Sequence, residues 1–156
     1  MKFAILSVLL LLIIFIALKL ATPKLGKLAV GGIIDTDGER SLADCPDTPN
    51  CQSSEATSES QRVDRFVINN DPEQAIATLA DIVKQQVGTQ IVAQDANYLH
   101  ATFSTPLMGY VDDVEFLLSE DDSSVQVRSA SRLGHSDLGA NAKRVEHLRK
   151  VASGTL

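Results

Sequence analysis

The sequence predicts an α+β fold in which an antiparallel sheet of about five strands carries two helices on one face, behind an N-terminal transmembrane helix. Over most of residues 89–132, apolar and polar residues alternate with a period of two, as in half-buried strands. Residues 72–87 and those after Gly134 instead repeat every three to four positions, as in amphipathic helices. The 156 residues are enough for one such domain with its own core.

The chain begins with an apolar run. Phe3 to Leu18 holds sixteen residues without a charge, and the run reaches nineteen residues at Ala21 if Lys19 is included. A helix of that length measures about 28 Å, close to the roughly 30 Å of a bilayer's hydrocarbon core. Signal peptidase prefers small residues three and one positions before its cut, and Lys19 does not fit that preference. We therefore expect a retained anchor over residues 1–21, with the lipid bilayer as the partner of residues 3–21; a cleaved signal and a buried core helix are the alternatives.

A tether is expected after the anchor. Residues 22–44 are rich in Gly, Lys, Thr and Asp and show little periodicity, so we interpret them as a juxtamembrane tether. The folded domain is then expected over residues 45–156. Lysines on both sides of the apolar run leave its orientation in the membrane undecided.

Cys45 and Cys51 are the only cysteines of the chain, and they enclose two prolines and an aspartate in CPDTPNC. A membrane-tethered domain outside the cytoplasm would let them pair. A disulfide across this loop would stabilise the fold by about 2 to 3 kcal/mol. Reduced thiols are the alternative, and a zinc site is disfavoured because no histidine is adjacent in the sequence. We expect the disulfide, in a single-pass protein whose domain is extracytoplasmic, that is, periplasmic.

The domain is expected to start with a strand over Val63–Asn69 and a helix from Pro72 to about Val87. Asp71 is a good N-cap residue, and proline is well tolerated at the first helical position. Gly88 is expected to end the helix. The apolar residues that repeat at helical spacing are Ile76, Leu79, Ala80, Val83 and Val87.

Two hairpins and a closing helix follow. TQIVAQD (89–95) pairs with YLHATFST (98–105), and YVDDVEFLLS (110–119) pairs with SVQVRSASR (124–132) through the turn EDDSS. The expected element order is β-α-β-β-β-β-α. The closing helix is predicted from the apolar face of Leu138, Ala142, Val145, Leu148 and Ala152.

The net charge of −6 is unevenly distributed. Residues 1–30 carry a charge of +4, residues 31–124 a charge of −14 and residues 125–156 a charge of +4. An acidic body repels phosphates, so nucleic acid is not expected as a partner. Only the last thirty or so residues could form a local basic patch.

Three segments resemble the bacterial and plastid domain of unknown function family 1499: CPDTPNC with the following QSS, GYVDDVEF, and VRSASRLGHSDLGANAKRVEHLR. The resemblance covers about Cys45 to Arg149. It implies a small α+β domain, often carried behind a membrane-spanning or export segment, with no established enzyme activity and no agreed ligand. The characteristic polar positions that it implies are Asp112, Asp113, Glu115, Arg128, Ser129, Ser131, Arg132, Asp137, Asn141 and Arg144.

These polar residues suggest a structural role and a binding role. Glu115 and Arg128 lie at similar distances from the turn, so a cross-strand ion pair is expected, and Asp113 is expected to be structural as well. At an exposed sheet face such a pair contributes about 0.2 to 1 kcal/mol. Arginines beside the start of the last helix could also bind carboxylate or phosphate. The residues expected to line a pocket for a small anionic or polar ligand are Arg128, Ser131, Arg132, His135, Asp137, Asn141 and Arg144.

Two enzyme interpretations compete with binding. Ser131, His135 and Asp137 are the residue types of a hydrolytic triad, although no G-x-S-x-G motif is present. Asp112, Asp113, Glu115, His135 and Asp137 could hold a divalent metal, although alternation sends Asp112 and Asp113 to opposite faces. We expect a binding or envelope-scaffold module instead, with no catalytic residue, no metal and no cofactor; the sequence does not indicate a protein partner.

Overall fold

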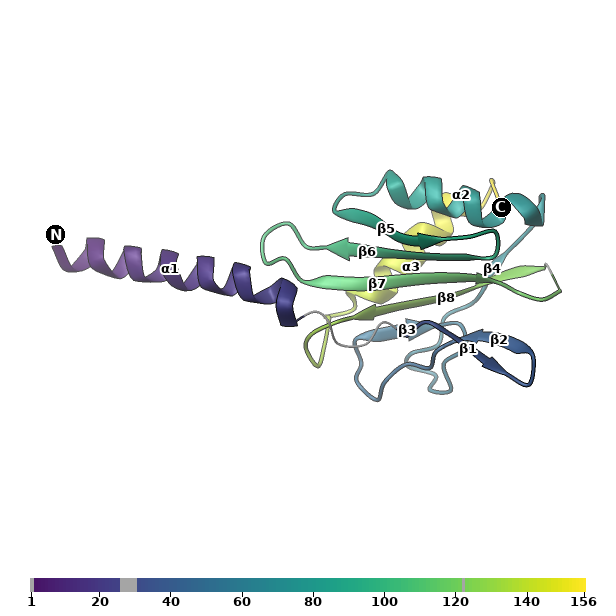
Figure 1. The fold of residues 1–156 in the computed structure, drawn as a ribbon, viewed down its shortest axis with the longest axis horizontal. Coiled ribbons are helices and arrows are strands. Elements are labelled where there is room, and N and C mark those ends of the chain that lie inside the picture. The colour runs from purple at the N-terminus through teal and green to yellow at the C-terminus, as the bar shows by residue number, and fades with distance from the viewer. Residues whose placement is uncertain (1, 26–30, 122) are drawn as a thin grey trace.

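The domain is an antiparallel sheet with two helices on one face and a hairpin on the other, behind a long N-terminal helix (Figure 1). The computed structural model describes residues 2–25, 31–121 and 123–156, and within the first helix it describes the side chains of residues 6–17. The elements are α1 (Lys2–Leu25), β1 (Ile33–Thr36), β2 (Glu39–Leu42), β3 (Cys51–Ser53), β4 (Phe66–Val67), α2 (Pro72–Lys84), β5 (Thr89–Gln94), β6 (Tyr98–Ser104), β7 (Val111–Leu118), β8 (Ser124–Ser131) and α3 (Ala140–Ala152).

The main sheet has six strands. Its path is β3-β8-β7-β6-β5, and β4 pairs with the far end of β8. All of these pairings are antiparallel. The α+β class and the antiparallel sheet are confirmed. The strand expected over Val63–Asn69 is shorter than predicted, since only Phe66 and Val67 pair, and β3 was not expected.

The helices α2 and α3 cover one face of the sheet, and the main core lies between them. Alternation along the strands sends Leu99, Val114, Phe116 and Val127 into this core. The α2 helix starts as predicted, with the Asp71 carboxylate accepting from the Glu73 backbone N–H at 3.0 Å. It ends at Lys84 rather than near Val87, because the chain already turns there towards β5.

The hairpin of β1 and β2 lies against the opposite face. This is a correction, because residues 22–44 were expected to be a tether without regular structure, whereas residues 33–42 form paired strands. Leu42 is buried, and its backbone N–H donates to Gln126 Oε1 at 3.1 Å. Such short strands with several charged residues have no clear apolar alternation, so the sequence pattern did not reveal them. Residues 26–30 of the expected tether lie outside the described residues.

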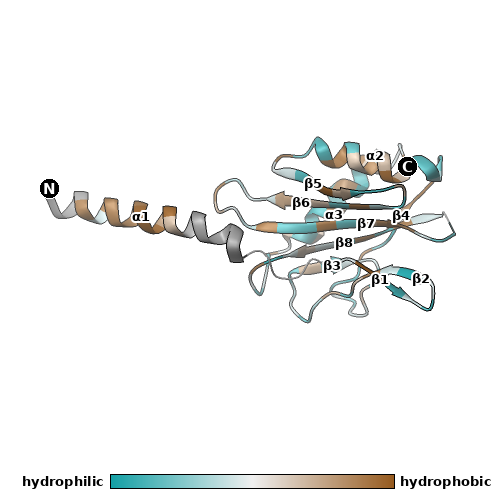
Figure 2. Ribbon diagram, viewed as in Figure 1, coloured by the Kyte–Doolittle hydropathy of each residue, from teal (hydrophilic) through white to brown (hydrophobic). Residues whose placement is uncertain are grey.

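The α1 helix is 24 residues long, and the part of its ribbon that is coloured in Figure 2 is mostly hydrophobic. All described side chains of α1, residues 6–17, are exposed. Among the described residues, no helix combines the length and hydropathy that crossing a membrane requires. The ends of the span expected over residues 3–21 have side chains outside the described set.

Candidate functional site

Three buried carboxylates on β7 each pair with an arginine. Arg144 Nη2 lies 2.6 Å from Asp112 Oδ2, and Arg132 Nη2 lies 2.7 Å from Asp113 Oδ1. In the third pair, Arg128 Nη1 lies 3.1 Å from Glu115 Oε2. Because side chains alternate along a strand, the Asp112 pair lies on the helix face and the other two pairs lie on the hairpin face. The arginines of the family motif are therefore divided between two sides of the sheet.

Glu115 is the centre of the first cluster on the hairpin face. Its side chain is fully buried, and its Oε1 accepts hydrogen bonds from the Tyr98 hydroxyl at 2.7 Å and the Gly32 backbone N–H at 2.8 Å. Burial, together with the neighbouring Glu115 carboxylate, raises the pKa of Tyr98 well above its ordinary value, so the phenol stays a donor at neutral pH. The pairing register puts Arg128 directly opposite Glu115. The expectation of an exposed pair was wrong, because both side chains are buried.

Asp113 is the centre of the second cluster on this face. Arg132 donates to both of its oxygens, from Nε and Nη2 at 2.7 Å each, and His100 Nε2 lies 2.7 Å from Oδ1. Burial by itself raises the pKa of Asp113, but the hydrogen bonds with Arg132 and His100 outweigh burial and leave the pKa below its ordinary value. The same contact with Asp113 raises the pKa of Arg132. Asp113 is therefore held as a carboxylate.

The helix-face network centres on Asn141. Its side chain is fully buried, and its Nδ2 donates to the Asn50 carbonyl at 2.9 Å and to Ser131 Oγ at 3.0 Å. Its Oδ1 accepts from Ser129 Oγ at 2.6 Å and from Arg144 Nη1 at 2.5 Å. One asparagine thereby joins α3, β8 and the loop before β3. Both polar atoms of the Asn141 side chain are engaged in hydrogen bonds within the domain, which indicates a structural role.

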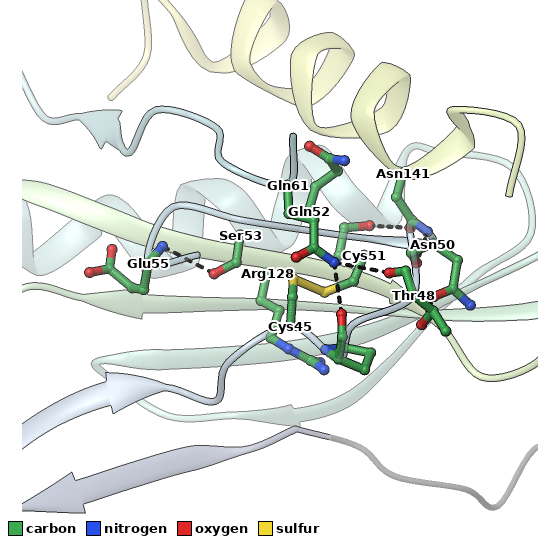
Figure 3. Close-up of a disulfide and its surroundings, with 12 residues drawn as sticks. Cys45, Thr48, Asn50, Cys51, Gln52, Ser53, Glu55, Gln61, Arg128 and Asn141 are labelled. Carbon is green, nitrogen blue, oxygen red and sulfur yellow. Dashed lines mark hydrogen bonds between the residues drawn. A yellow bond between two sulfur atoms is a disulfide. The ribbon is translucent and has the colours of Figure 1, made fainter. Parts of the chain in front are cut away.

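Cys45 and Cys51 form the expected disulfide, and the loop between them is fixed to the domain (Figure 3). Gln61 Nε2 donates to the carbonyls of Pro46 and Thr48 at 2.8 and 2.9 Å. Asn50 donates from Nδ2 to the Gly134 carbonyl at 2.6 Å. The bonds from Gln61 satisfy two carbonyls of the loop, and the bond from Asn50 joins the loop to the segment between β8 and α3.

An open groove of about 500 Å³ lies between this loop and the end of β8, and we name it the Arg128 groove. Arg128 lies on its wall with 4% of its surface exposed. Among the described residues, the one hydrogen bond of the Arg128 side chain is that from Nη1 to Glu115, and its buried Nε has no partner. The groove is lined by Gly31, Asp44, Cys45, Pro46, Thr48, Asn50, Arg128, Ala130, Ser131, Arg132 and Gly134.

Gly31 packs directly on the Arg128 guanidinium. A Cβ atom built on Gly31 would lie 2.7 Å from Cζ and Nη1 of Arg128 and 3.0 Å from Nε. Such distances are too short for any side chain, so only glycine fits this position without displacing the arginine. Gly31, the first described residue after α1, therefore forms part of the groove wall.

The seven residues expected to form one pocket are not all brought together. Arg128, Ser131 and Arg132 line the Arg128 groove, whereas Asn141 and Arg144 belong to the helix-face network. The Asp137 carboxylate accepts from the backbone N–H groups of Gly139 and Asn141 at the start of α3. His135 is exposed and is not among the groove residues. The predicted single pocket divides because Arg128 and Arg132 face the hairpin side of the sheet, whereas Asn141 and Arg144 lie on α3, which covers the other side.

The two enzyme arrangements are not assembled. Within the described part of the chain, no hydrogen bond joins Ser131 to His135 or His135 to Asp137, and Ser131 Oγ is engaged by Asn141. The same residues contain no group of three or more His, Cys, Asp or Glu side chains placed to hold a metal ion. Asp112 and Asp113 lie on opposite faces, as alternation requires.

Sequence reasoning missed several members of these clusters. His100 was not singled out, although it is buried and its Nε2 is hydrogen-bonded to Asp113. Tyr98, Asn50 and Gln126 were not singled out either. The pairing of β6 with β7 could have indicated them. Tyr98 and His100 lie on the same face of the sheet as Glu115, and His100 is the residue directly opposite Glu115. What the register does not reveal is that this face is covered.

Comparisons with known proteins give a family and no function. No curated protein and no solved structure matches this chain. The family model described as protein of unknown function (DUF1499) matches residues 41–151. That match includes the disulfide loop, β7, β8 and most of α3, which carry all three arginine–carboxylate pairs. The chain therefore belongs to the DUF1499 family.

Proposed function

We propose that this protein is a membrane-anchored, extracytoplasmic binding domain that takes a small ligand in the Arg128 groove. The ligand class is a compound with a carboxylate or another oxygen acceptor. The observation that carries the proposal is the buried Nε of Arg128, which has no hydrogen-bond partner among the described residues. A buried N–H group without an acceptor costs about 1 to 3 kcal/mol, and a bound oxygen would recover that loss.

The geometry of the guanidinium favours a planar acceptor. Arg128 donates to Glu115 from Nη1, so the edge of the guanidinium formed by Nε and Nη2 remains for a ligand. Two parallel N–H groups on that edge suit a carboxylate. Because Nε is buried, a ligand must displace Gly31 slightly to reach it, and Gly31 has no side chain that would need to be repacked.

The charge of the groove argues against a polyanion. Arg128 is paired with Glu115 and Arg132 is paired with Asp113, so each positive charge already has a buried counter-charge. Asp44 adds a further carboxylate to the lining. A compound with one carboxylate, or a neutral compound with a carbonyl group, is therefore favoured over a phosphate-rich ligand.

Anchoring and location are supported by α1 and by the disulfide. The described side chains of α1 are exposed and almost all apolar, and no part of the domain covers them. A helix of 24 residues is about 36 Å long, more than the thickness of a bilayer core. The disulfide suits an oxidising compartment outside the cytoplasm.

A thermal-shift screen of the full-length protein in detergent micelles tests the ligand site. Small monocarboxylic acids and neutral carbonyl compounds are screened against the wild type, and any compound that raises its melting temperature is tested again on Arg128→Lys. That variant keeps a positive charge near Glu115 but has no Nε, so the compound-induced shift should disappear. Arg149→Lys, which changes an arginine of α3 outside the groove, should keep the full shift.

Three outcomes contradict the proposal: a screen without any stabilising compound, a shift that persists in Arg128→Lys, or a shift that Arg149→Lys abolishes equally. If Arg128→Lys is itself less stable, direct binding is measured by calorimetry at a temperature where the variant is folded. The proposal then requires weaker binding to Arg128→Lys than to the wild type.

A further inference from the structure

Exposed apolar side chains gather at one end of the domain. Outside α1, the three most exposed large hydrophobic side chains of the described residues are Leu138 (89%), Val87 (86%) and Leu107 (68%). Water-exposed apolar groups of this kind, when several lie together, mark an interaction surface. Met108 and Tyr110 are also exposed and lie close to Leu107 in the sequence. We name the whole group the proximal patch; it comprises Val87, Leu107, Met108, Tyr110 and Leu138.

Three loops bring the proximal patch together. The backbone N–H of Ser104 donates to the Gly88 carbonyl at 2.8 Å, which joins the turn after α2 to the end of β6. Residues of the loop between β6 and β7 and of the loop between β8 and α3 line the same cavity of about 230 Å³, including Tyr110 and Gly134. The five side chains therefore project from loops that meet at one end of the sheet.

This end of the sheet is also where the chain arrives from α1. Gly31 lines the Arg128 groove together with Gly134, which is part of the loop that carries Leu138. The five residues between Leu25 and Gly31 can span at most about 21 Å, even fully extended. Figure 1 shows α1 and the loops of the proximal patch at the same end of the domain, with the β1–β2 and β7–β8 turns at the other end. A short connection thus keeps the end of α1 close to the patch.

We infer that the proximal patch rests in the interfacial layer of the membrane that α1 crosses, so that the domain lies on the bilayer in one orientation. This inference rests on the anchoring proposed above. Tyrosine suits that layer because its ring is apolar and its hydroxyl is polar. Exposed leucine, valine and methionine side chains are removed from water where they enter the boundary between headgroups and acyl chains. Leu138 has a φ of 54°, which bulky residues rarely adopt. Its strained backbone holds an almost fully exposed apolar side chain, and such strain is typical of functional surfaces.

The charge at the far end agrees with this orientation. Among the described residues, the turns that lie away from α1 and the strand ends beside them carry five acidic residues. The Arg40 backbone N–H donates to Glu120 and joins the two turns. Membranes that contain anionic lipids repel such a cluster, so the acidic end is expected to point away from the surface. The five residues are Asp35, Asp37, Glu39, Glu120 and Asp121.

The test uses the full chain reconstituted in vesicles of phosphatidylcholine and phosphatidylglycerol. An environment-sensitive fluorophore is attached at Leu138→Cys or Leu107→Cys, with the native disulfide intact. Val67→Cys is the matched control, since Val67 is 65% exposed but pairs with Ser124 beside the far turn. Quenchers carried on the lipids should reduce the emission at positions 138 and 107 several-fold more than at position 67, and the emission at the first two should shift to the blue.

The outcomes separate this inference from the anchoring itself. A chain that does not float with the vesicles contradicts the anchor. A chain that floats, but whose labels at 138 and 107 are quenched no more than the label at 67, contradicts the membrane contact alone. A blue shift that grows with the protein-to-lipid ratio and ignores the lipid quencher indicates a second copy on the patch, and it also overturns the inference.

Discussion

Arg128 lies directly opposite Glu115 on neighbouring strands, and their side chains form an ion pair of 3.1 Å inside the domain. Breaking such a pair on one side leaves a buried charge without its partner. Of the donors that the described residues supply, Glu115 would then keep those from Tyr98 and Gly32. The ion pair thus contributes to folding as well as to the wall of the groove.

Arg128→Met is expected to lower the free energy of unfolding by about 3 to 5 kcal/mol. The double variant Arg128→Met/Glu115→Gln should recover a large part of this loss, because the unpaired charge is removed. Chemical denaturation of the full chain measures both. Lys84→Gln is the control: it breaks an exposed pair with Asp81 and should cost less than about 1 kcal/mol. An equal loss in Arg128→Met and Lys84→Gln would show that burial of the first pair does not matter.

Gly31→Ala is expected to displace the Arg128 guanidinium. The added Cβ would lie 2.7 Å from Cζ, so either the arginine or the Gly31 segment must move. The expected loss is about 1 to 3 kcal/mol, together with weaker binding in the Arg128 groove. Gly154→Ala, where a Cβ would meet no atom within 4 Å, should change stability by less than about 0.5 kcal/mol. A neutral Gly31→Ala would contradict the close packing.

The stability of the domain should fall in acid partly through Asp113. Its pKa is lower in the folded protein than the ordinary value of about 3.9, so the unfolded chain takes up the proton first as the pH falls. The contribution of Asp113 is therefore present above about pH 4 and is lost as the pH falls below it. Asp113→Asn should lower stability at neutral pH and flatten its decline in acid, as measured by denaturation between neutral pH and about pH 2. A decline as steep as that of the wild type would assign the acid sensitivity to other groups, such as Asp121, whose pKa is lowered to about 2 by hydrogen bonds from Ser119 and Ser123.

Removing the disulfide should lower the stability of the domain. Cys45→Ser/Cys51→Ser is expected to lower the free energy of unfolding by about 2 to 3 kcal/mol, because the unfolded chain gains freedom. The bonds from Gln61 and Asn50 should hold the loop in place at low temperature. Unfolding with and without a reductant tests this: the wild type should lose stability, and the double variant should not respond. A response of the double variant would point to an effect of the reductant itself.

The elements with strong local signals were predicted from the sequence. Asp71 and Pro72 mark the start of α2, and the period of two marks the strands β5 to β8. The register of the β7–β8 hairpin follows from the turn, and it places Glu115 opposite Arg128. The hairpin of β1 and β2 could not be predicted in this way, because its strands are four residues each and Leu42 becomes buried only against the distant β8.

The sequence by itself determined the α+β class, the N-cap of α2, the register of the β7–β8 hairpin and the two cysteines that pair, because all of these depend on residues close to one another along the chain or on a strict alternation. Only the tertiary structure decided which faces are covered. It buries His100, Asp113 and Glu115, and it separates Arg128 and Arg132 from Arg144 on the two sides of the sheet. The physical reason is that burial depends on segments distant in sequence. Gly31 packs on Arg128, and the backbone N–H of Gly32 donates to Glu115. Glycines have no side chains, so no hydropathy pattern could predict these contacts.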